Sequence, residues 1–375
     1  MGFDWLSNEN IVLVNPRFPV RDREKLNEML EKEKDLHAHV CLATSGSSQG
    51  IGGFPKWVLL TKKGILHSAS AVNHHLEASS DDRWIHALPD FHVGGLAIWA
   101  RSWLSQSLVS LYAEKWNPHT FCQFVEAEKG TLTSLVPTQI FDLVSCALHS
   151  PKCLRAIVVG GGKLHEKLYG KARELGWNLL PSYGLTECAS QVATAPLKSL
   201  TEFSYPSLTI LPHVKVGINE DKITLASPSL LTAYILQTAH GIQRIDPKVD
   251  GIFQTEDNGR ISQGGLTPLG RATDFIKISG ESVDFSRLEA FLENAKLACG
   301  LKEDIVLIAW PDARLGHAVH LVAESSISST DDLISHFNKN VMPYERIREV
   351  HYVSQIPRSS LGKLQQQELK NILFK

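Results

Sequence analysis

Residues 179–194 read LLPSYGLTECASQVAT, and this stretch passes from apolar residues typical of a buried strand into a polar turn. An aromatic ring such as that of Tyr183 can stack on a purine, and Gly184 lets the backbone approach a ligand closely. The hydroxyl of Thr186 can donate to a phosphate, and the carboxylate of Glu187 can hold Mg²⁺. The stretch therefore predicts a nucleotide site, with an ordinary strand-to-helix turn as the alternative.

A loop rich in serine and glycine lies upstream, at residues 44–56, TSGSSQGIGGFPK. It follows the apolar run 40–43 and offers hydroxyls and backbone N–H groups to a polyphosphate, with Lys56 as a point charge. The spacing is not that of a Walker A loop, because Lys56 follows Pro55 and precedes Trp57. A solvated turn is the alternative for this loop.

Seven segments in order resemble the core motifs of the AMP-forming acyl-CoA synthetase and adenylation-domain superfamily, and the match runs from about residue 41 to the end. Within that superfamily, residues 134–144, 154–190 and 312–322 are similar to the o-succinylbenzoate-CoA ligases of menaquinone synthesis. The seven segments are TSGSS…PK, LPDFHVGGL, VVGGGKL, SYGLTE, DGIFQTEDNG, GRATDFIKISG and IPRSSLGKL.

The resemblance implies an ATP-dependent acid-thiol ligase that forms an acyl-adenylate and then an acyl-CoA thioester. ATP, Mg²⁺ and CoA are the implied cofactors, and o-succinylbenzoate is the implied acid. Three alternatives stay open: a different aryl or fatty acid, transfer to a carrier protein, and a degenerate nucleotide-binding protein without catalysis. Thr186, Glu187, Asp257, Arg271 and Lys363 are all retained, which argues against the degenerate protein.

The resemblance also implies catalytic, nucleotide-binding and acid-binding roles for single residues. The catalytic residues are Lys363, Thr186, Glu187 and His92, and Glu187 is also the Mg²⁺ ligand. The nucleotide contacts are Thr44, Ser45, Gly46, Ser47, Ser48, Lys56, Gly161, Gly162, Tyr183, Gly184, Asp257 and Arg271. The acid contacts are His92, Arg101, Gln139, Gly160 and Ser182, and the hinge between domain orientations is Thr273.

Arg101 lies within the apolar segment 96–104, where an arginine ordinarily makes a salt bridge at a helix end. If the acid is a dicarboxylate, a buried guanidinium beside the acyl pocket has a second use, because it can pair bidentately with the distal carboxylate.

The chain departs from the family pattern at several points. Only about forty residues precede the serine-rich loop, whereas family members usually carry a much longer N-terminal region. Either the form is minimal or part of the acyl-pocket wall comes from elsewhere, and a second subunit of a homodimer could supply it. Residues 49–54 lengthen the loop, Glu256 replaces a glycine before Asp257, and Thr273 replaces the usual pivot residue.

Short apolar strands alternate with amphipathic segments from residue 108 onward, which predicts βα units. The expected fold is α/β: a large N-terminal domain, residues 1–270, has mainly parallel sheets flanked by helices plus a small β subdomain at 214–234. Residues 271–375 are expected to form a mobile α+β domain that carries Lys363. The expected strands are 108–112, 132–136, 154–159 and 177–181, and the expected helices 117–127, 138–148 and 164–175.

The composition, 43% hydrophobic and 21% charged with a formal net charge of −2, is that of a globular protein with no electrostatic footprint for nucleic acid. No apolar run approaches the roughly 18 to 20 residues of a membrane span, and no secretion signal is evident. The six cysteines form no C-x-x-C pair, and the histidines lack H-E-x-x-H spacing, which argues against a transition-metal site. We expect a cytoplasmic enzyme of small molecules.

Overall fold

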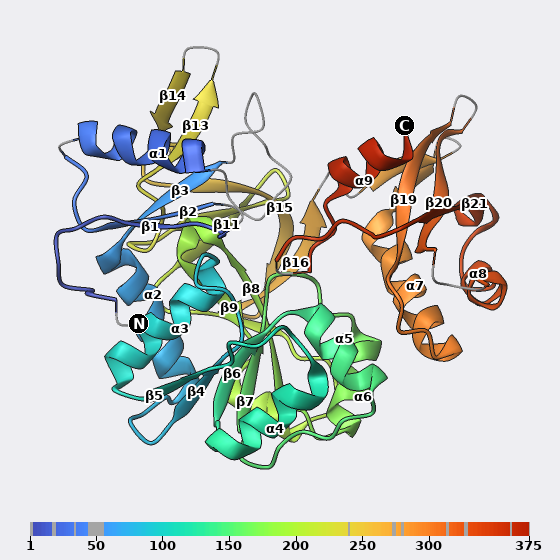
Figure 1. The fold of residues 1–375 in the computed structure, drawn as a ribbon, viewed down its shortest axis with the longest axis horizontal. Helices are drawn as coiled ribbons and strands as arrows, with labels where there is room; N and C mark the ends of the chain where they lie inside the picture. Colours follow the sequence, from blue (N-terminus) through green and yellow to red (C-terminus); the bar gives the residue numbers. More distant parts are fainter. Residues whose placement is uncertain are drawn as a thin grey trace.

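The computed structural model describes residues 3–16, 20–33, 35–43, 56–238, 241–271, 275–278, 281–312, 315–325, 329–360 and 362–374. The described residues form three β-sheets flanked by helices, so the predicted α/β class is confirmed. The third sheet, at the C-terminal end of the chain, lies to one side of the other two (Figure 1).

The largest sheet has eleven strands in the described chain, in the order β11-β12-β15-β16-β10-β9-β8-β7-β6-β4-β5. Its parallel half consists of β4 (Arg83–His86), β5 (Leu108–Leu111), β6 (Leu132–Leu135), β7 (Ala156–Val159) and β8 (Leu179–Leu185). Its antiparallel half consists of β9 (Ser190–Thr194), β10 (Leu208–Ile210), β11 (Lys215–Asn219), β12 (Lys222–Ala226), β15 (Phe253–Ser262) and β16 (Gly265–Arg271).

Parallel pairing ends at β8 for a local reason. The short 3-10 helix η2 (Thr186–Cys188) joins β8 to β9, and a connection this short can only join antiparallel strands. The strands of the parallel half are instead joined through helices, as the sequence rhythm predicted. The motif around Tyr183 thus lies where the sheet changes from parallel to antiparallel.

Helices cover both faces of the parallel half. Alternate residues of a strand point to opposite faces, so Val158 packs with one helical layer while Ile157 and Val159 pack with the other. One layer is α2 (Lys62–Leu76) and α3 (Val93–Ser105). The other is α4 (Pro118–Glu128), α5 (Pro137–Ser145) and α6 (Glu166–Glu174).

The second sheet packs against α1 (Val20–Lys32) through Leu26 and Leu30. The strands expected within 214–234 are present but are divided between sheets: β11 and β12 extend the largest sheet, because Ile223 and Leu225 are buried in its core, whereas β13 pairs with β3. The second sheet consists of β1 (Ile11–Leu13), β2 (His39–Ala43), β3 (Trp57–Thr61), β13 (Ala233–Thr238) and β14 (Gly241–Ile245).

The third sheet has its own apolar core, in which Leu288, Val319 and Phe337 are buried. Its strands are β17 (Phe275–Ile278), β18 (Glu281–Asp284), β19 (Ile305–Asp312), β20 (Gly316–Glu324) and β21 (Ile347–Val353). Its helices are α7 (Phe285–Cys299), α8 (Asp331–Asn338) and α9 (Gln366–Leu373). Two further 3-10 helices are η3 (Leu197–Thr201) and η5 (Pro343–Glu345). Among the described helices, none combines the length and apolarity that crossing a bilayer requires.

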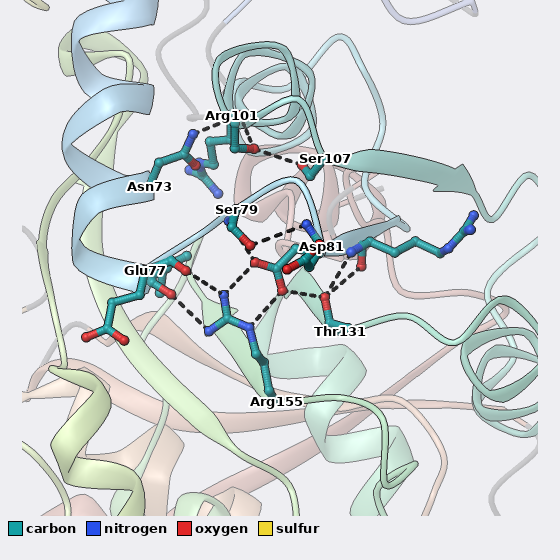
Figure 2. Close-up of polar contacts among 12 residues, drawn as sticks. Asn73, Glu77, Ser79, Asp81, Arg101, Ser107, Thr131 and Arg155 are labelled. Carbon is teal, nitrogen blue, oxygen red and sulfur yellow. Dashed lines mark hydrogen bonds and ion pairs between the residues drawn. The ribbon is translucent and has the colours of Figure 1, made fainter.

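An ion pair links the amino ends of three parallel strands. Arg155 donates from Nε and Nη2 to the two carboxylate oxygens of Asp82, both at 2.8 Å, and Thr131 donates to Asp82 at 2.7 Å. Figure 2 shows the Arg155 guanidinium between the backbone of Glu77 and the loop that carries Ser79. The pair therefore links the end of α2 to the starts of β4, β6 and β7.

Asp82→Asn should lower the free energy of unfolding by about 2 kcal/mol, because it breaks a partly buried ion pair. Although burial opposes it, hydrogen bonding by Arg155 and Thr131 holds the pKa of Asp82 below its ordinary 3.8. The stabilisation is therefore present at neutral pH and is lost as the pH falls through that lowered pKa, so the difference between the two proteins should shrink below about pH 4. Urea unfolding at pH 7 and at pH 3 measures both differences, and a gap at pH 3 as large as the gap at pH 7 would contradict this account.

Candidate functional site

The predicted site residues gather at the carboxyl ends of the parallel strands. His92 follows β4, Gln139 lies in the first turn of α5 after β6, and Gly160 to Gly162 follow β7. Tyr183 and Gly184 lie in the last part of β8, which pairs with β7. The carboxyl edge of a parallel sheet is where such folds bind ligands. The structure brings these motifs together at this edge, which we call the rim.

Tyr183 and Asp257 meet across the antiparallel half of the sheet. The Tyr183 hydroxyl donates to the Asp257 carboxylate at 2.9 Å, although the two residues are 74 positions apart. Asp257 lies within β15, opposite Arg271 of β16, and not in an exposed turn. Position 184 requires glycine, because a Cβ there would lie 2.1 Å from the carbonyl oxygen of Ser190. The aromatic ring and the carboxylate are thus positioned together by the hairpin after β8.

Glu187 lies in η2 beside a lysine and a second tyrosine. Tyr234 donates to Glu187 Oε1 at 2.9 Å, and Lys56 Nζ lies 3.5 Å from the same oxygen. The Lys56 ammonium also stands 4.4 Å from the centre of the Tyr234 ring. Mg²⁺ prefers oxygen ligands, and the half-buried Glu187 carboxylate offers two. The long side chain of Lys56 lets its ammonium move away from this carboxylate.

Small residues line the rim between β7, β8 and α5. A Cβ on Gly160 would lie 3.1 Å from Ser182 Oγ, and a Cβ on Gly161, whose φ is +79°, would lie 3.2 Å from Val136. Ser182 donates to the carbonyl of Val159 at 2.9 Å. The side-chain amide oxygen of Gln139 accepts from the backbone N–H of Val136 at 3.0 Å, so this oxygen caps α5. Its amide nitrogen is the atom that remains for the predicted contact with the acid.

His92 faces the loop that carries Lys363. Its Nε2 lies 2.7 Å from Ser360 Oγ, a contact between residues 268 positions apart. Burial, together with the nearby positive charge of Lys363, lowers the pKa of His92 to about 4. The imidazole is therefore neutral at physiological pH and can accept or donate a hydrogen bond without adding charge.

Arg358 and Gly362 hold the Lys363 loop in place. Arg358 makes a bidentate pair with Asp304, which directly precedes β19, and donates to the Gly362 carbonyl at 2.6 Å. Gly362 has a φ of +73°, and a Cβ there would lie 2.8 Å from Thr138 Oγ1 of α5. The loop thus packs closely against the N-terminus of α5, and the exposed Lys363 side chain follows directly.

Arg101 is buried between α3 and the sheet, with 1% of its surface exposed. Its partners are two distant hydroxyls, Ser134 at 3.4 Å and Ser190 at 3.3 Å, and its guanidinium stands 5.4 Å from the centre of the Trp84 ring. No carboxylate of the described residues pairs with it, and its Nε has no described partner. Burial lowers its pKa to about 9, so it stays charged at pH 7. Among the described residues, no partner forms the helix-end salt bridge that was its ordinary alternative.

Some predicted positions lie outside the described residues or have no described side chain. Thr44, Ser45, Gly46, Ser47, Ser48 and Thr273 lie outside the described part of the chain, and only the backbone of Arg271 is described. The predicted roles of these residues stay predictions. Thr186 begins η2, directly after β8. A Cβ on Gly162 would lie 3.6 Å from Pro137 at the start of α5. Thr186 and Gly162 therefore both lie at the rim.

Three residues of the site were not predicted. Ser360 contacts His92, Tyr234 contacts Glu187, and Asp90 holds the loop before His92 by accepting from Trp99 at 2.7 Å and from His86 at 3.0 Å. Asp90 and Ser360 lie inside two of the seven segments that resemble the family motifs, so their positions were a usable signal. Tyr234 lies on the second sheet, and nothing in its local sequence distinguishes it.

The chain resembles known proteins in sequence and in fold. A model of the family described as AMP-binding enzyme matches residues 16–223, which is more than half of the chain. The 2-succinylbenzoate–CoA ligase of Lactococcus lactis is 29% identical over 324 residues, 84% of this chain and 68% of that protein. The enzyme of the same name from Bacillus pumilus is 26% identical over 355 residues, 91% of this chain and 71% of its own.

Solved structures share the fold. The o-succinylbenzoate-CoA synthetase of Bacillus subtilis in complex with its acyl-adenylate intermediate has a TM-score of 0.74 at 22% identity, covering 96% of this chain and 78% of that one. The same enzyme with ATP and a magnesium ion has a TM-score of 0.73 at 22% identity, covering 96% and 79%. ATP-bound MatB from Rhodopseudomonas palustris has a TM-score of 0.70 at 20% identity, covering 90% and 69%.

Lys363→Ala should raise the pKa of His92 above its present value of about 4, because a neighbouring positive charge is removed. The pKa should stay below 6.5, since burial is the larger cause and is unchanged. His165 is a matched control: its pKa is also lowered to about 4, by burial and by Lys163. Titration of the imidazole C–H signals by NMR measures both, and an unmoved His92 or an equal shift of His165 would contradict the predicted proximity.

Proposed function

This chain belongs to the AMP-binding enzyme family, and from that premise we propose that it is an AMP-forming carboxylic acid–CoA ligase that acts on o-succinylbenzoate. Relatives that cover most of the chain are 2-succinylbenzoate–CoA ligases, which supports this choice of acid. The cosubstrates are ATP and CoA, with Mg²⁺ as the metal ion. The observation that carries the choice of acid is the buried guanidinium of Arg101, which has no carboxylate partner among the described residues.

The nucleotide would lie along the hairpin after β8. The Tyr183 ring offers a face for the adenine, and Asp257 offers carboxylate oxygens to the ribose hydroxyls, held in position by the Tyr183 hydroxyl. Glu187 fits Mg²⁺, which when bound would screen the phosphate charge. Lys56, now beside Glu187, is placed to move to a phosphate oxygen.

The first step joins the acid to AMP. A carboxylate oxygen attacks the α-phosphorus of ATP, the bond from that phosphorus to the bridging oxygen breaks, and pyrophosphate leaves with the electron pair. Catalysis of this step depends on charge neutralisation and in-line placement. The Lys363 ammonium would stabilise the redistributed negative charge, and neutral His92 would position the acid.

The second step transfers the acyl group to CoA. The thiolate attacks the acyl carbon, and the bond to the AMP oxygen breaks as AMP leaves. We propose that residues 271–375 form a mobile domain that rotates about Thr273 and clears the Lys363 loop from the site. The contacts of this loop with the rest of the chain support the idea, since Gly362 packs on Thr138 and Ser360 on His92 through single residues.

Arg101 would bind the second carboxylate of the acid. A fully buried cation without an anionic partner is costly to the fold, because its desolvation is not offset. Ser134 lies just before α5, and Ser190 lies just after the turn that carries Glu187, so the guanidinium lies close to two elements of the rim. A dicarboxylate would supply the missing charge, whereas a fatty acid or benzoate would not.

An exposed apolar edge supports the proposal of a homodimer. Leu108 and Leu111 of the edge strand β5 are more than half exposed, and Trp103 and Leu104 of α3 are exposed as well. Uncovered strand edges with apolar side chains favour pairing with another chain. All six cysteines are free thiols, which supports a cytoplasmic location.

Lys363→Ala should reduce acyl-adenylate formation at least about a hundredfold, because a group that acts mainly on the transition state is removed. Thioester formation from supplied acyl-adenylate and CoA should keep its rate. Both half-reactions and the melting temperature are measured on the same variant. Equal loss in both steps at an unchanged melting temperature would refute the rotation mechanism, and no loss in either would remove Lys363 from the site.

Arg101→Gln should raise the KM for o-succinylbenzoate roughly a hundredfold, since it removes the charge partner of a buried carboxylate. Activity with benzoate, which lacks the second carboxylate, should be low in both proteins and unchanged by the substitution. The melting temperature should stay equal or rise, because an unpaired buried charge is removed. If the wild type prefers benzoate or a medium-chain fatty acid, o-succinylbenzoate is refuted as the substrate, while the adenylation chemistry stays intact.

A further inference from the structure

Three side chains that can ligate metals converge on the third sheet, away from the rim. They are His320 of β20 and Glu349 and His351 of β21, and one ligand atom from each lies within 4.8 Å of the others. His320 Nδ1 lies 2.8 Å from His351 Nε2 and 3.9 Å from Glu349 Oε2. β20 and β21 run parallel with His320 opposite Glu349, and residues two apart on a strand share a face. The three therefore project from one side of the sheet.

Aromatic stacking fixes the two imidazoles. The Trp310 ring stacks on His320, with centroids 5.4 Å apart and planes at 11°, and on His351, at 4.9 Å and 27°. Phe374 stacks on Trp310 at 4.5 Å. His320 is buried, whereas the Glu349 side chain is 63% exposed. The pair of imidazoles is thus rigidly held on one side, and the third group closes the cluster from the solvent side.

We propose that His320, Glu349 and His351 bind one divalent transition-metal ion, and that zinc is the ion this donor set favours. Two imidazole nitrogens and one carboxylate oxygen are a common zinc donor set, and it leaves a fourth position for water. Mg²⁺ and Ca²⁺ prefer oxygen donors throughout. The site is distinct from the Mg²⁺ ligand Glu187 in both position and chemistry.

The present distances bracket those that zinc requires. Zinc–nitrogen bonds of about 2.0 to 2.1 Å in tetrahedral geometry place neighbouring ligand atoms roughly 3.3 Å apart. This value lies between the 2.8 Å that separates the two imidazoles and the 3.9 Å from His320 to Glu349. The third pair of donor atoms, on His351 and Glu349, also lies within 4.8 Å, and rotation of the exposed Glu349 side chain can bring the three donors to this spacing.

The proton between the two imidazoles is retained when the ion binds. In the 2.8 Å contact one ring nitrogen carries the proton and the other accepts it. On binding, that proton moves to the other nitrogen of its own ring, so His320 Nδ1 and His351 Nε2 both present lone pairs. Metal ligation requires these two lone pairs.

The ion site runs against the expectation from sequence spacing. His320 and His351 are 31 positions apart, and the strand pairing alone brings them together. The pattern Glu-x-His at 349–351 is the one local signal, since alternate residues of a strand share a face.

Zinc binding to the full chain, freed of metal by chelator dialysis and kept reduced, tests the proposal by competition with a chromophoric chelator. We expect one tight zinc ion per chain that excess Mg²⁺ does not displace. His351→Ala and Glu349→Gln should each weaken this binding at least tenfold. His336→Ala, which removes an exposed histidine of α8 in the same part of the chain, should leave it unchanged. His320 is left intact because its burial makes replacement a risk to folding.

Two further readouts locate the ion. Zinc should raise the melting temperature of the wild type and of His336→Ala but not of His351→Ala, because an ion that binds the folded state stabilises it. Zinc should also change the tryptophan fluorescence, and Trp310→Phe should abolish that change. Equal zinc affinity in the wild type, His351→Ala and Glu349→Gln would overturn the proposal and assign the zinc to free thiols such as Cys122 and Cys299.

Discussion

Gly184 lies so close to the carbonyl oxygen of Ser190 that any side chain there would be 2.1 Å from it. This close approach lets β9 fold directly back on β8, and the return ends the parallel half of the sheet. Because β9 runs antiparallel, β10, β16 and β15 can follow it in the sheet, and β15 brings Asp257 to Tyr183. The same turn carries Glu187 toward the second sheet, where Tyr234 donates to it. One backbone contact thus determines where three groups of the rim lie.

The charges of the rim are unevenly matched. Arg101 is buried without a carboxylate, and Lys363 lies near an imidazole whose pKa of about 4 leaves it neutral. Lys56 has Glu187 as a partner, but a single carboxylate does not serve both a lysine and a metal ion at full strength. Anionic ligands complete such a set of cations, and electrostatic interactions are strong where water is excluded. The proposed substrates bring their own negative charge and would complete this set.

Local sequence predicted the parallel half of the sheet and the rim, because strand and helix periodicity and the order of motifs depend on neighbouring residues. It did not predict contacts that depend on docking between distant parts of the chain. Ser360 reaches His92 across 268 positions, and Tyr234 reaches Glu187 from another sheet. The small β subdomain was anticipated as one unit, yet the burial of Ile223 and Leu225 draws β11 and β12 into the largest sheet, while β13 pairs with β3 in the second. Packing, rather than strand propensity, decided where those strands pair.

Helix α5 lies between two parts of the proposed machinery. Its start touches Gly161 and Gly162 of the rim through Val136 and Pro137, and its first turn receives Gly362 through Thr138. Lys296 of α7 also lies 4.7 Å from the centre of the Phe141 ring of α5. A ligand at the rim that shifts α5 changes the free energy of the contact between α5 and the Lys363 loop. Such coupling is reciprocal, so docking of the loop changes the free energy of ligand binding as well. In the proposed reaction, acid binding and the docking of the Lys363 loop are thereby thermodynamically linked, and each would strengthen or weaken the other by the same factor.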